Sequence, residues 1–183
     1  MSDKPKRVLC LLAAGFEEIE TIAPVDLLRR AGAEVHIASL SGDALVTGRS
    51  GVTVQADLAL ADADTSSYDL LLLPGGPGAK TMRQDGRARD LARAFAAAGK
   101  PVAAICAAPT VLFDAGLLED KRYTAHFSVW NELREALGHE RVVQDGLLVT
   151  SRGAGTAVEF GLALVSRLFG IDAADQIARS IMV

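Results

Sequence analysis

The sequence predicts an α/β fold. We expect one doubly wound, mostly parallel β-sheet with helices on both faces, together with a small β-hairpin. Three observations support this prediction. Short apolar runs typical of buried parallel strands alternate with stretches of helical apolar spacing. Glycines end several of the helical stretches, and no internal repeat, low-complexity segment or linker divides the chain. We therefore expect residues 1–183 to form a single domain.

Four segments have the composition of strands in the main sheet. Residues 7–12 and 69–73 each begin with a single charged residue, Arg7 or Asp69, and continue as an apolar run. Residues 34–40 alternate between polar and apolar side chains, and residues 101–105 are a short apolar run that includes β-branched residues.

Two further segments predict hairpins. Residues 45–54 carry two short β-type runs around a turn at residues 48–51. Residues 142–150 carry two such runs around Asp145-Gly146, a dipeptide typical of tight hairpin turns.

Four stretches predict helices. They are residues 17–30, 87–98, 107–116 and 156–169. The apolar positions of the first are Ile19, Ile22, Val25 and Leu28. Pro24 lies inside this pattern and predicts a kink or a late start, because proline lacks the N–H donor of a helix interior. In the third stretch, Leu112 and Phe113 are the expected core residues.

Composition excludes several function classes. The formal net charge is −4 with no basic stripe, which argues against a nucleic-acid partner. Residues 8–14 are apolar but too short for a membrane span or signal peptide, and residues 4–7 are expected to be a solvated terminus. Cys10 and Cys106 make no disulfide framework, so we expect a cytoplasmic protein with no membrane partner.

Cys106 is the strongest candidate for chemistry. It lies between the apolar run at residues 101–105 and the predicted helix at residues 107–116. Free N–H groups and the macrodipole at a helix N-terminus favour a thiolate, which is the nucleophilic form of cysteine. By residue type alone, Cys106 is more often expected to be a small buried hydrophobe, as most free cysteines are, and only its context favours a nucleophile.

Three loops follow strands of the predicted sheet, and parallel strands bring their carboxyl ends to one edge. They are residues 13–20, 74–78 and 106–108. The glycines of the second loop fit neither a dinucleotide fingerprint nor a P-loop. Beside a nucleophile, the N–H groups of Gly76 and Ala107 are candidates for an oxyanion hole.

An acidic cluster of Glu17, Glu18 and Glu20 opens the first predicted helix. Acidic residues in a first helical turn ordinarily complement the helix dipole. Glu20, however, shares a helical face with Phe16 and Pro24, so it is the member expected to face inward. A protonated carboxyl near Cys106 would donate a hydrogen bond to the thiolate or supply a proton.

Of the three histidines, His126 is the candidate partner of Cys106. His36 alternates within a predicted strand and is expected to be structural, and His139 lies in a polar loop. No histidine pair has metal-ligand spacing and no Cys-x-x-Cys motif is present, so no metal site is predicted.

Five motifs, in order, resemble the ThiJ/PfpI superfamily and its DJ-one-like branch, that of the Parkinsonism-associated deglycase. They are Gly-Phe-Glu-Glu-Ile-Glu-Thr at 15–21, Pro-Val-Asp-Leu-Leu-Arg-Arg-Ala-Gly at 24–32, Leu-Pro-Gly-Gly at 73–76, Ala-Ile-Cys-Ala-Ala-Pro-Thr at 104–110 and Thr-Ser-Arg-Gly-Ala-Gly-Thr at 150–156. The resemblance extends from residue 7 to about residue 169 and implies a flavodoxin-like fold.

The resemblance also implies roles for single residues. Cys106 matches the family's reactive cysteine, Glu20 its protonated glutamate and His126 a nearby histidine. Gly75 and Gly76 match the glycine pair beside the cysteine. The resemblance implies a homodimer with the first helix near the interface. The positions that match this dimer region are Glu17, Asp26 and Arg29.

The activities that the resemblance implies need no cofactor. They are conversion of α-oxoaldehydes such as methylglyoxal to lactate, and repair of early glycation adducts, with a small aldehyde or a glycated group as the partner. Redox sensing through oxidation of Cys106 to a sulfinate, and a chaperone role, are the alternatives. Ala107 stands where the protease branch has histidine, so no protease activity is expected. The order Arg49-Ser50-Gly51 also departs from the Ser-Arg-Gly of close bacterial relatives.

Overall fold

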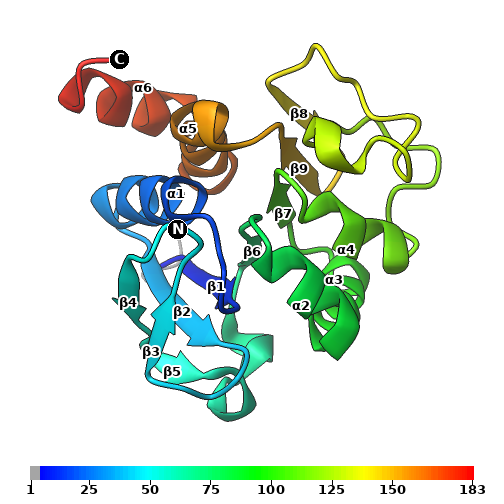
Figure 1. Ribbon diagram of the computed structural model, residues 1–183. Coiled ribbons are helices and arrows are strands. Elements are labelled where there is room, and N and C mark those ends of the chain that lie inside the picture. Colours follow the sequence, from blue (N-terminus) through cyan, green and yellow to red (C-terminus); the bar gives the residue numbers. More distant parts are fainter. Residues whose placement is uncertain (1–4) are drawn as a thin grey trace.

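The computed structural model describes residues 5–183 and has a seven-stranded sheet at its centre, between two groups of helices (Figure 1). The strands are β1 (Arg7–Leu12), β2 (Glu34–Ser39), β5 (Leu58–Ala59), β6 (Leu70–Leu73), β7 (Val102–Ile105), β8 (Val142–Asp145) and β9 (Leu148–Ser151). Their order is β5-β2-β1-β6-β7-β9-β8, and only the β8–β9 pair is antiparallel. This confirms the predicted α/β fold with a mostly parallel sheet.

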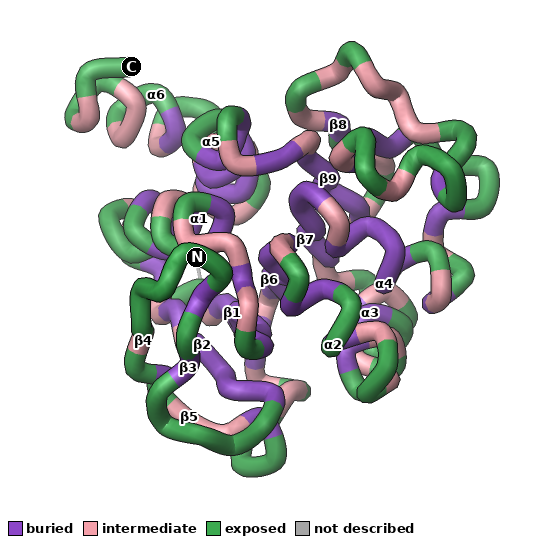
Figure 2. The backbone as a smooth tube through the Cα atoms, viewed as in Figure 1, coloured by how far each residue is buried: buried purple, intermediate pink, exposed green. Residues whose placement is uncertain are grey.

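The helices cover both faces of the sheet, as predicted. They are α1 (Glu18–Arg30), α2 (Gly78–Asp85), α3 (Arg87–Ala97), α4 (Pro109–Asp114), α5 (Ala157–Phe169) and α6 (Ile171–Ser180). Alternate side chains of each strand point to opposite faces, so β1 places Leu9 and Leu11 in one core and Cys10 in the other. Helices α2, α3 and α4 close the first core, and α1, α5 and α6 close the second. The strands form the buried centre in Figure 2.

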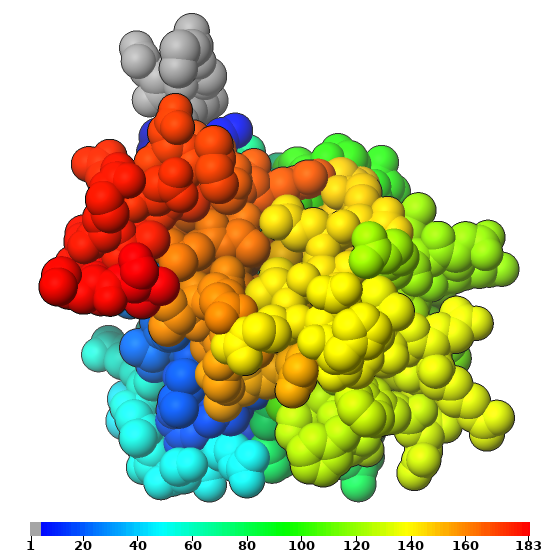
Figure 3. Space-filling model, turned by 90° about the horizontal axis from the view of Figure 1, so that it is seen from above, coloured from blue at the N-terminus to red at the C-terminus, as the bar shows by residue number. Residues whose placement is uncertain are grey.

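Both predicted hairpins are present. β3 (Leu45–Thr47) pairs antiparallel with β4 (Thr53–Gln55), and β8 pairs antiparallel with β9. From above, α5 and α6 cover one side of the molecule and the segment around residues 120–150 covers the other (Figure 3). No helix among residues 5–183 has the length and apolar character needed to cross a membrane. Of the terminus expected at residues 4–7, Lys4 lies outside the described residues.

Helix α1 differs from its prediction in two ways. It begins at Glu18 and runs through Pro24 to Arg30, so the late start is wrong. Ile19 and Ile22 belong to the apolar pattern, yet they are 54% and 42% exposed. The buried face of α1 is the one that carries Glu20, Thr21 and Pro24 together with Val25 and Leu28.

One other local prediction is wrong, and two helices are absent from the predicted elements. Phe113 was expected in the core but is 48% exposed, because it lies in the last turn of the six-residue helix α4. Helices α2 and α6 were not predicted. Each buries few side chains. In α6 Ala174 is buried, and Ala173 and Ile177 are partly buried against the core.

Candidate active site

Cys106 lies on a sharp turn between β7 and α4. Its φ angle is +66°, in the left-handed region that costs a non-glycine residue about 1 kcal/mol or more. Two other segments of the chain hold this turn by backbone hydrogen bonds. The Cys106 N–H donates to the Ser151 carbonyl at 2.9 Å, and the His126 N–H donates to the Cys106 carbonyl at 2.9 Å. This turn projects the sulfur atom past the carboxyl end of the sheet.

Gly75 and Gly76 pack directly against this turn. A Cβ atom at Gly75 would lie 2.6 Å from Cys106 Cβ and 2.6 Å from a carboxyl oxygen of Glu20. Gly76 has a φ angle of +77°, and a Cβ there would lie 2.6 Å from the Glu17 nitrogen. Glycine is therefore required at both positions, one for close approach and one for conformation. The predicted convergence of the loops that follow β1, β6 and β7 is confirmed.

Glu20 is the buried member of the acidic cluster and is 1% exposed. Its Oε2 accepts a hydrogen bond from the Gly75 N–H at 3.1 Å, and its carboxyl group lies beside Cys106. Glu17 caps α1 by accepting from the Glu20 N–H at 2.8 Å. Burial raises the pKa of Glu20 to about 7, although the hydrogen bond with Cys106 acts in the opposite direction.

The pKa of the Cys106 thiol moves opposite to the prediction. The oxyanion-hole role of Gly76 and Ala107 stays a prediction. Hydrogen bonding from their N–H groups lowers the pKa of the Cys106 thiol. Burial and the charge of Glu20 outweigh them and raise the pKa of Cys106 to about 12. The predicted preference for a thiolate is therefore wrong while Glu20 is ionised.

The two groups titrate as a pair. The charge of Glu20 no longer opposes the thiolate once the carboxyl group holds a proton. In the singly protonated pair, the proton lies either on the sulfur or on the carboxyl group, and the thiolate is present only in the second arrangement. The pair loses its first proton near pH 7, the value to which burial raises the pKa of Glu20.

His126 lies beside this pair. A Cβ atom built on Gly153 would lie 3.3 Å from His126 Cδ2, 3.7 Å from Glu20 Oε1 and 4.0 Å from Cys106 Sγ. The three predicted catalytic side chains therefore meet around Gly153. His126 Nδ1 hydrogen-bonds the Ser128 hydroxyl at 2.9 Å, and burial, followed by the charge of Arg49, lowers the pKa of His126. The imidazole is neutral near pH 7.

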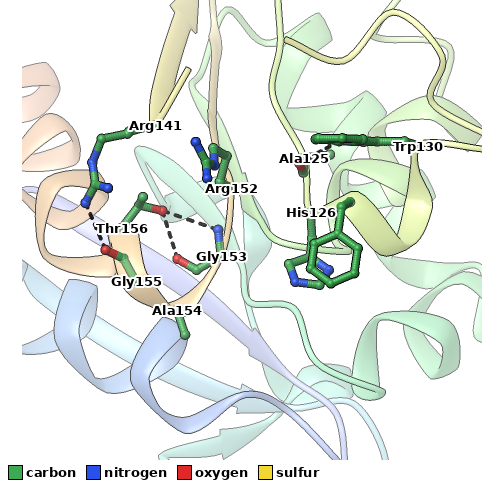
Figure 4. Close-up of a pocket in the computed structure, with 10 residues that line it drawn as sticks. Ala125, His126, Trp130, Arg141, Arg152, Gly153, Ala154, Gly155 and Thr156 are labelled. Atoms are coloured by element: carbon green, nitrogen blue, oxygen red, sulfur yellow. Dashed lines mark hydrogen bonds between the residues drawn. The ribbon is translucent and has the colours of Figure 1, made fainter. Parts of the chain in front are cut away.

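A cavity of about 350 Å³ is lined by His126 and by Gly153, the glycine beside Cys106 and Glu20, which do not themselves line it (Figure 4). Its lining residues are Ala125, His126, Phe127, Trp130, Arg141, Arg152, Gly153, Ala154, Gly155 and Thr156. In Figure 4, the loop from Arg152 to Thr156 faces His126 and Trp130 across the opening. Our sequence reasoning did not assign a role to the two arginines or to Trp130. The loop after β9 also follows a parallel strand, and the rule that selected the other three loops would have included it.

The residues of the expected dimer region make contacts within the chain. Asp26 pairs with Arg30 at 2.7 Å, and Arg29 pairs with Asp57 at 3.2 Å. The expected homodimer stays a prediction. No group of three or more histidine, cysteine or acidic side chains within residues 5–183 is arranged to hold a metal ion.

The other candidates have structural surroundings. Cys10 is fully buried in β1, where desolvation raises the pKa of its thiol to about 12. His36 Nδ1 hydrogen-bonds the Tyr68 hydroxyl at 2.8 Å, and His139 is exposed. The structure therefore supports the expectation that only one of the two cysteines and one of the three histidines belong to the site.

Comparison with known proteins identifies relatives along nearly the whole chain. Protein dj-1beta of Drosophila melanogaster is 38% identical over 182 residues, which cover 97% of each chain. Its crystal structure matches the fold with a TM-score of 0.94 at 38% identity, over 98% of this chain and 99% of that one.

Two further relatives differ in length. Protein DJ-1 homolog B of Arabidopsis thaliana is 37% identical over 180 residues, and the match covers 97% of this chain but only 41% of the plant protein. Deglycase TK1284 of Thermococcus kodakarensis is 37% identical over 153 residues, which cover 81% of this chain and 91% of that protein.

The family model described as the DJ-1/PfpI family matches residues 6–167. This span includes the Cys106 turn, the Gly75-Gly76 loop and Glu20, and it agrees with the five motifs found in the sequence. The chain belongs to the DJ-1/PfpI family.

Proposed function

We propose that the protein is a cofactor-independent enzyme that converts α-oxoaldehydes to hydroxy acids, with methylglyoxal and lactate as the simplest pair. The observation that carries the proposal is the meeting of the Cys106 thiol and the Glu20 carboxyl group at the end of the sheet, where a Cβ atom built on Gly153 would lie 4.0 Å from Cys106 Sγ and 3.7 Å from Glu20 Oε1. The similarity to a protein named deglycase supports an activity of the same kind, on early glycation adducts.

In the first step, Glu20 accepts the thiol proton while Cys106 Sγ attacks the aldehyde carbon C1. An S–C1 bond forms, the carbonyl π bond breaks, and the product is a hemithioacetal. The N–H groups of Gly76 and Ala107 face the sulfur, so they can donate to the oxygen that becomes negative. Glu20 then returns the proton to that oxygen.

In the second step, a base removes the proton from C1 and an acid delivers a proton to C2 through an enediol. The neutral His126 imidazole lines the cavity and is suited to this transfer, and Glu20 is the alternative. The result is a thioester at C1. Water attacks the thioester, the S–C1 bond breaks, and the hydroxy acid leaves as the thiol recovers its proton.

The test measures lactate formed from methylglyoxal by purified protein without glutathione. We expect turnover in the wild type and in Cys10→Ser. In Cys106→Ser the rate of turnover should fall about 100-fold or more, because a serine hydroxyl is a much poorer nucleophile than a cysteine thiol. Absence of lactate, or equal turnover in Cys106→Ser, would contradict the proposal.

A second candidate function is redox sensing. Two molecules of peroxide would each transfer one oxygen atom to the Cys106 sulfur and leave as water, which gives a sulfinate. The hydrogen-bonding groups of Glu20, Gly76 and Ala107 around the sulfur favour this product. Intact-mass analysis after mild peroxide should show two added oxygen atoms in wild type and Cys10→Ser, and none in Cys106→Ser.

We also propose that the protein forms a homodimer through α1, as the family resemblance implies. Ile19 and Ile22 are exposed on this helix, between the expected interface positions Glu17 and Asp26. Sedimentation should show a dimer that dissociates in Ile22→Asp, because a charge is costly to bury without a partner. A monomeric wild-type protein would refute the dimer without affecting the proposed chemistry.

A further inference from the structure

The wall of the cavity lined by His126 and Gly153 carries a positive charge, at Arg152, that no carboxylate among residues 5–183 pairs with. Arg141 is paired, since its Nε lies 2.7 Å from a carboxylate oxygen of Glu159 and its Nη2 donates to the Gly155 carbonyl at 2.9 Å. Arg152 is different. Among residues 5–183 its side chain makes one hydrogen bond, a 3.4 Å contact with the His139 carbonyl, and meets no carboxylate. Its guanidinium group therefore has donors available to a ligand.

The position of Arg152 is fixed by the sheet. Its backbone N–H donates to the Arg141 carbonyl at 3.2 Å at the end of the β8–β9 hairpin. The next residue, Gly153, is the one around which Cys106, Glu20 and His126 meet. Thr156 accepts from the Gly153 N–H at 3.3 Å and donates to the Gly153 carbonyl at 2.8 Å, which holds the loop against the site. The backbone of Arg152 is thus anchored next to Gly153, the glycine beside Cys106, Glu20 and His126.

The opposite wall is aromatic. The Trp130 indole N–H donates to the Ala125 carbonyl at 3.0 Å, and the Phe127 ring packs on the His126 ring with centroids 4.1 Å apart. Figure 4 shows Arg152 and Trp130 on the two sides of the opening. A three-carbon aldehyde would fill only a small part of a cavity of about 350 Å³. The remaining space lies between the aromatic wall and the guanidinium group of Arg152, which pairs with no carboxylate among residues 5–183.

We propose that this cavity binds substrates that carry a carboxylate at the end remote from the aldehyde, with Arg152 as the residue that recognises the anion. The planar guanidinium fork matches a carboxylate in a two-bond arrangement, and the aromatic wall covers the carbon chain between the two ends. This inference rests on the proposed function and specifies its substrate class: anionic α-oxoaldehydes are preferred over neutral ones.

A simple substrate of this class is 4,5-dioxopentanoate. Attack of Cys106 on C5, transfer of the C5 proton to C4 and hydrolysis of the thioester would convert it with one water molecule to 2-hydroxyglutarate. The methyl ester of 4,5-dioxopentanoate has the same aldehyde but no negative charge. The ratio of kcat/KM for the acid to kcat/KM for the ester therefore isolates the contribution of the anion.

We expect the wild-type ratio to favour the acid and to fall about tenfold or more in Arg152→Ala, the usual size of a lost hydrogen bond to a charged group. Arg152→Lys should give an intermediate ratio, since lysine keeps the charge but not the fork. Arg122→Ala is the control, because it removes the same charge from an exposed side chain outside the cavity lining. Its ratio should equal that of the wild type.

A second measurement does not depend on turnover. Iodoacetate and iodoacetamide alkylate the same thiol and differ in charge. The ratio of their rates at Cys106, divided by the same ratio in urea-unfolded protein, should fall about fivefold or more in Arg152→Ala and stay unchanged in Arg122→Ala. A ratio within twofold of the wild type in Arg152→Ala, or an equal fall in Arg122→Ala, would overturn the carboxylate site. If neither aldehyde is turned over but the alkylation ratio falls as expected, the proposed function fails and the anion site stands.

Discussion

The two cysteines of this protein have the same raised thiol pKa, about 12, in opposite surroundings. Cys10 lies in the middle of β1, fully buried among apolar side chains, and Asp57 and Arg29 act on it only through their charge. Cys106 is 9% exposed at the end of β7, in a left-handed conformation next to a cavity. A pKa alone does not separate the two residues.

Their neighbours do separate them. Cys106 lies beside the Glu20 carboxyl group, the proton acceptor in the proposed mechanism, and beside the N–H groups of Gly76 and Ala107, which lower the pKa of its thiol. The left-handed backbone conformation of Cys106 is energetically unfavourable, and the surrounding loops hold the residue in it. Cys10 has a relaxed strand backbone. Reactivity in this fold therefore depends on a proton acceptor and access, and the end of a parallel strand supplies both.

The largest expected difference is in alkylation rate. In the folded protein, iodoacetamide should modify Cys106 about 1,000-fold faster than Cys10 or more, because exposure of Cys10 requires opening of a central strand paired on both sides. Peptide mass spectrometry over time measures both sites in one sample. The Cys106→Ser variant should remove the fast phase and leave the slow one. Comparable rates at the two cysteines would show that β1 opens far more readily than its burial indicates.

Gly75→Ala tests the packing that distinguishes the Cys106 site. The added methyl group would lie 2.6 Å from Cys106 Cβ and 2.8 Å from the Ile105 carbonyl oxygen, and a backbone atom cannot move aside cheaply. We expect a loss of about 3 kcal/mol in the free energy of unfolding, together with loss of lactate formation. Gly155→Ala is the matched control for stability alone, because the space around its Cβ position is open. Equal stability of the two variants in urea would contradict the close packing.

Much of this site can be predicted from the sequence because most strands of the sheet are parallel. Apolar runs identify the strands, parallel strands align their carboxyl ends, and the loops after β1, β6 and β7 therefore meet. Helical spacing likewise selects Glu20 from the acidic cluster, since Phe16 and Pro24 share its buried face.

Other features depend on long-range packing. The path of residues 107–141 brings Trp130 and Arg152 to one cavity, and no local pattern encodes that path. The pKa of the Cys106 thiol depends on its burial and on its distance from Glu20. Neither quantity can be read from the spacing of residues in the sequence. The exposure of Phe113 depends on how α4 ends against its neighbours rather than on the residue type.

Glu20→Gln tests the proton acceptor. In the wild type, the rate of Cys106 alkylation should rise with a midpoint near pH 7. Below that pH the pair holds both protons and the thiol is unreactive, and above it the carboxylate can accept the thiol proton. In Glu20→Gln the burial remains but the acceptor is gone, so the midpoint should move above the ordinary thiol value of 9.0 and the rate at pH 7 should fall about tenfold or more. An unchanged midpoint would show that Cys106 ionises without Glu20.

The smallest expected effect is a difference in stability between two serine variants. A hydroxyl at position 106 has hydrogen-bonding partners in Gly76, Ala107 and Glu20, whereas a hydroxyl at position 10 would be buried in an apolar core. Cys10→Ser should therefore lower the free energy of unfolding by about 1–3 kcal/mol, and by about 1 kcal/mol more than Cys106→Ser. Urea titrations at pH 7 measure both variants against the wild type. A larger loss in Cys106→Ser would mean that the groups around Cys106 are arranged for sulfur alone, and that the contrast between the two cysteines is one of packing as well as of proton transfer.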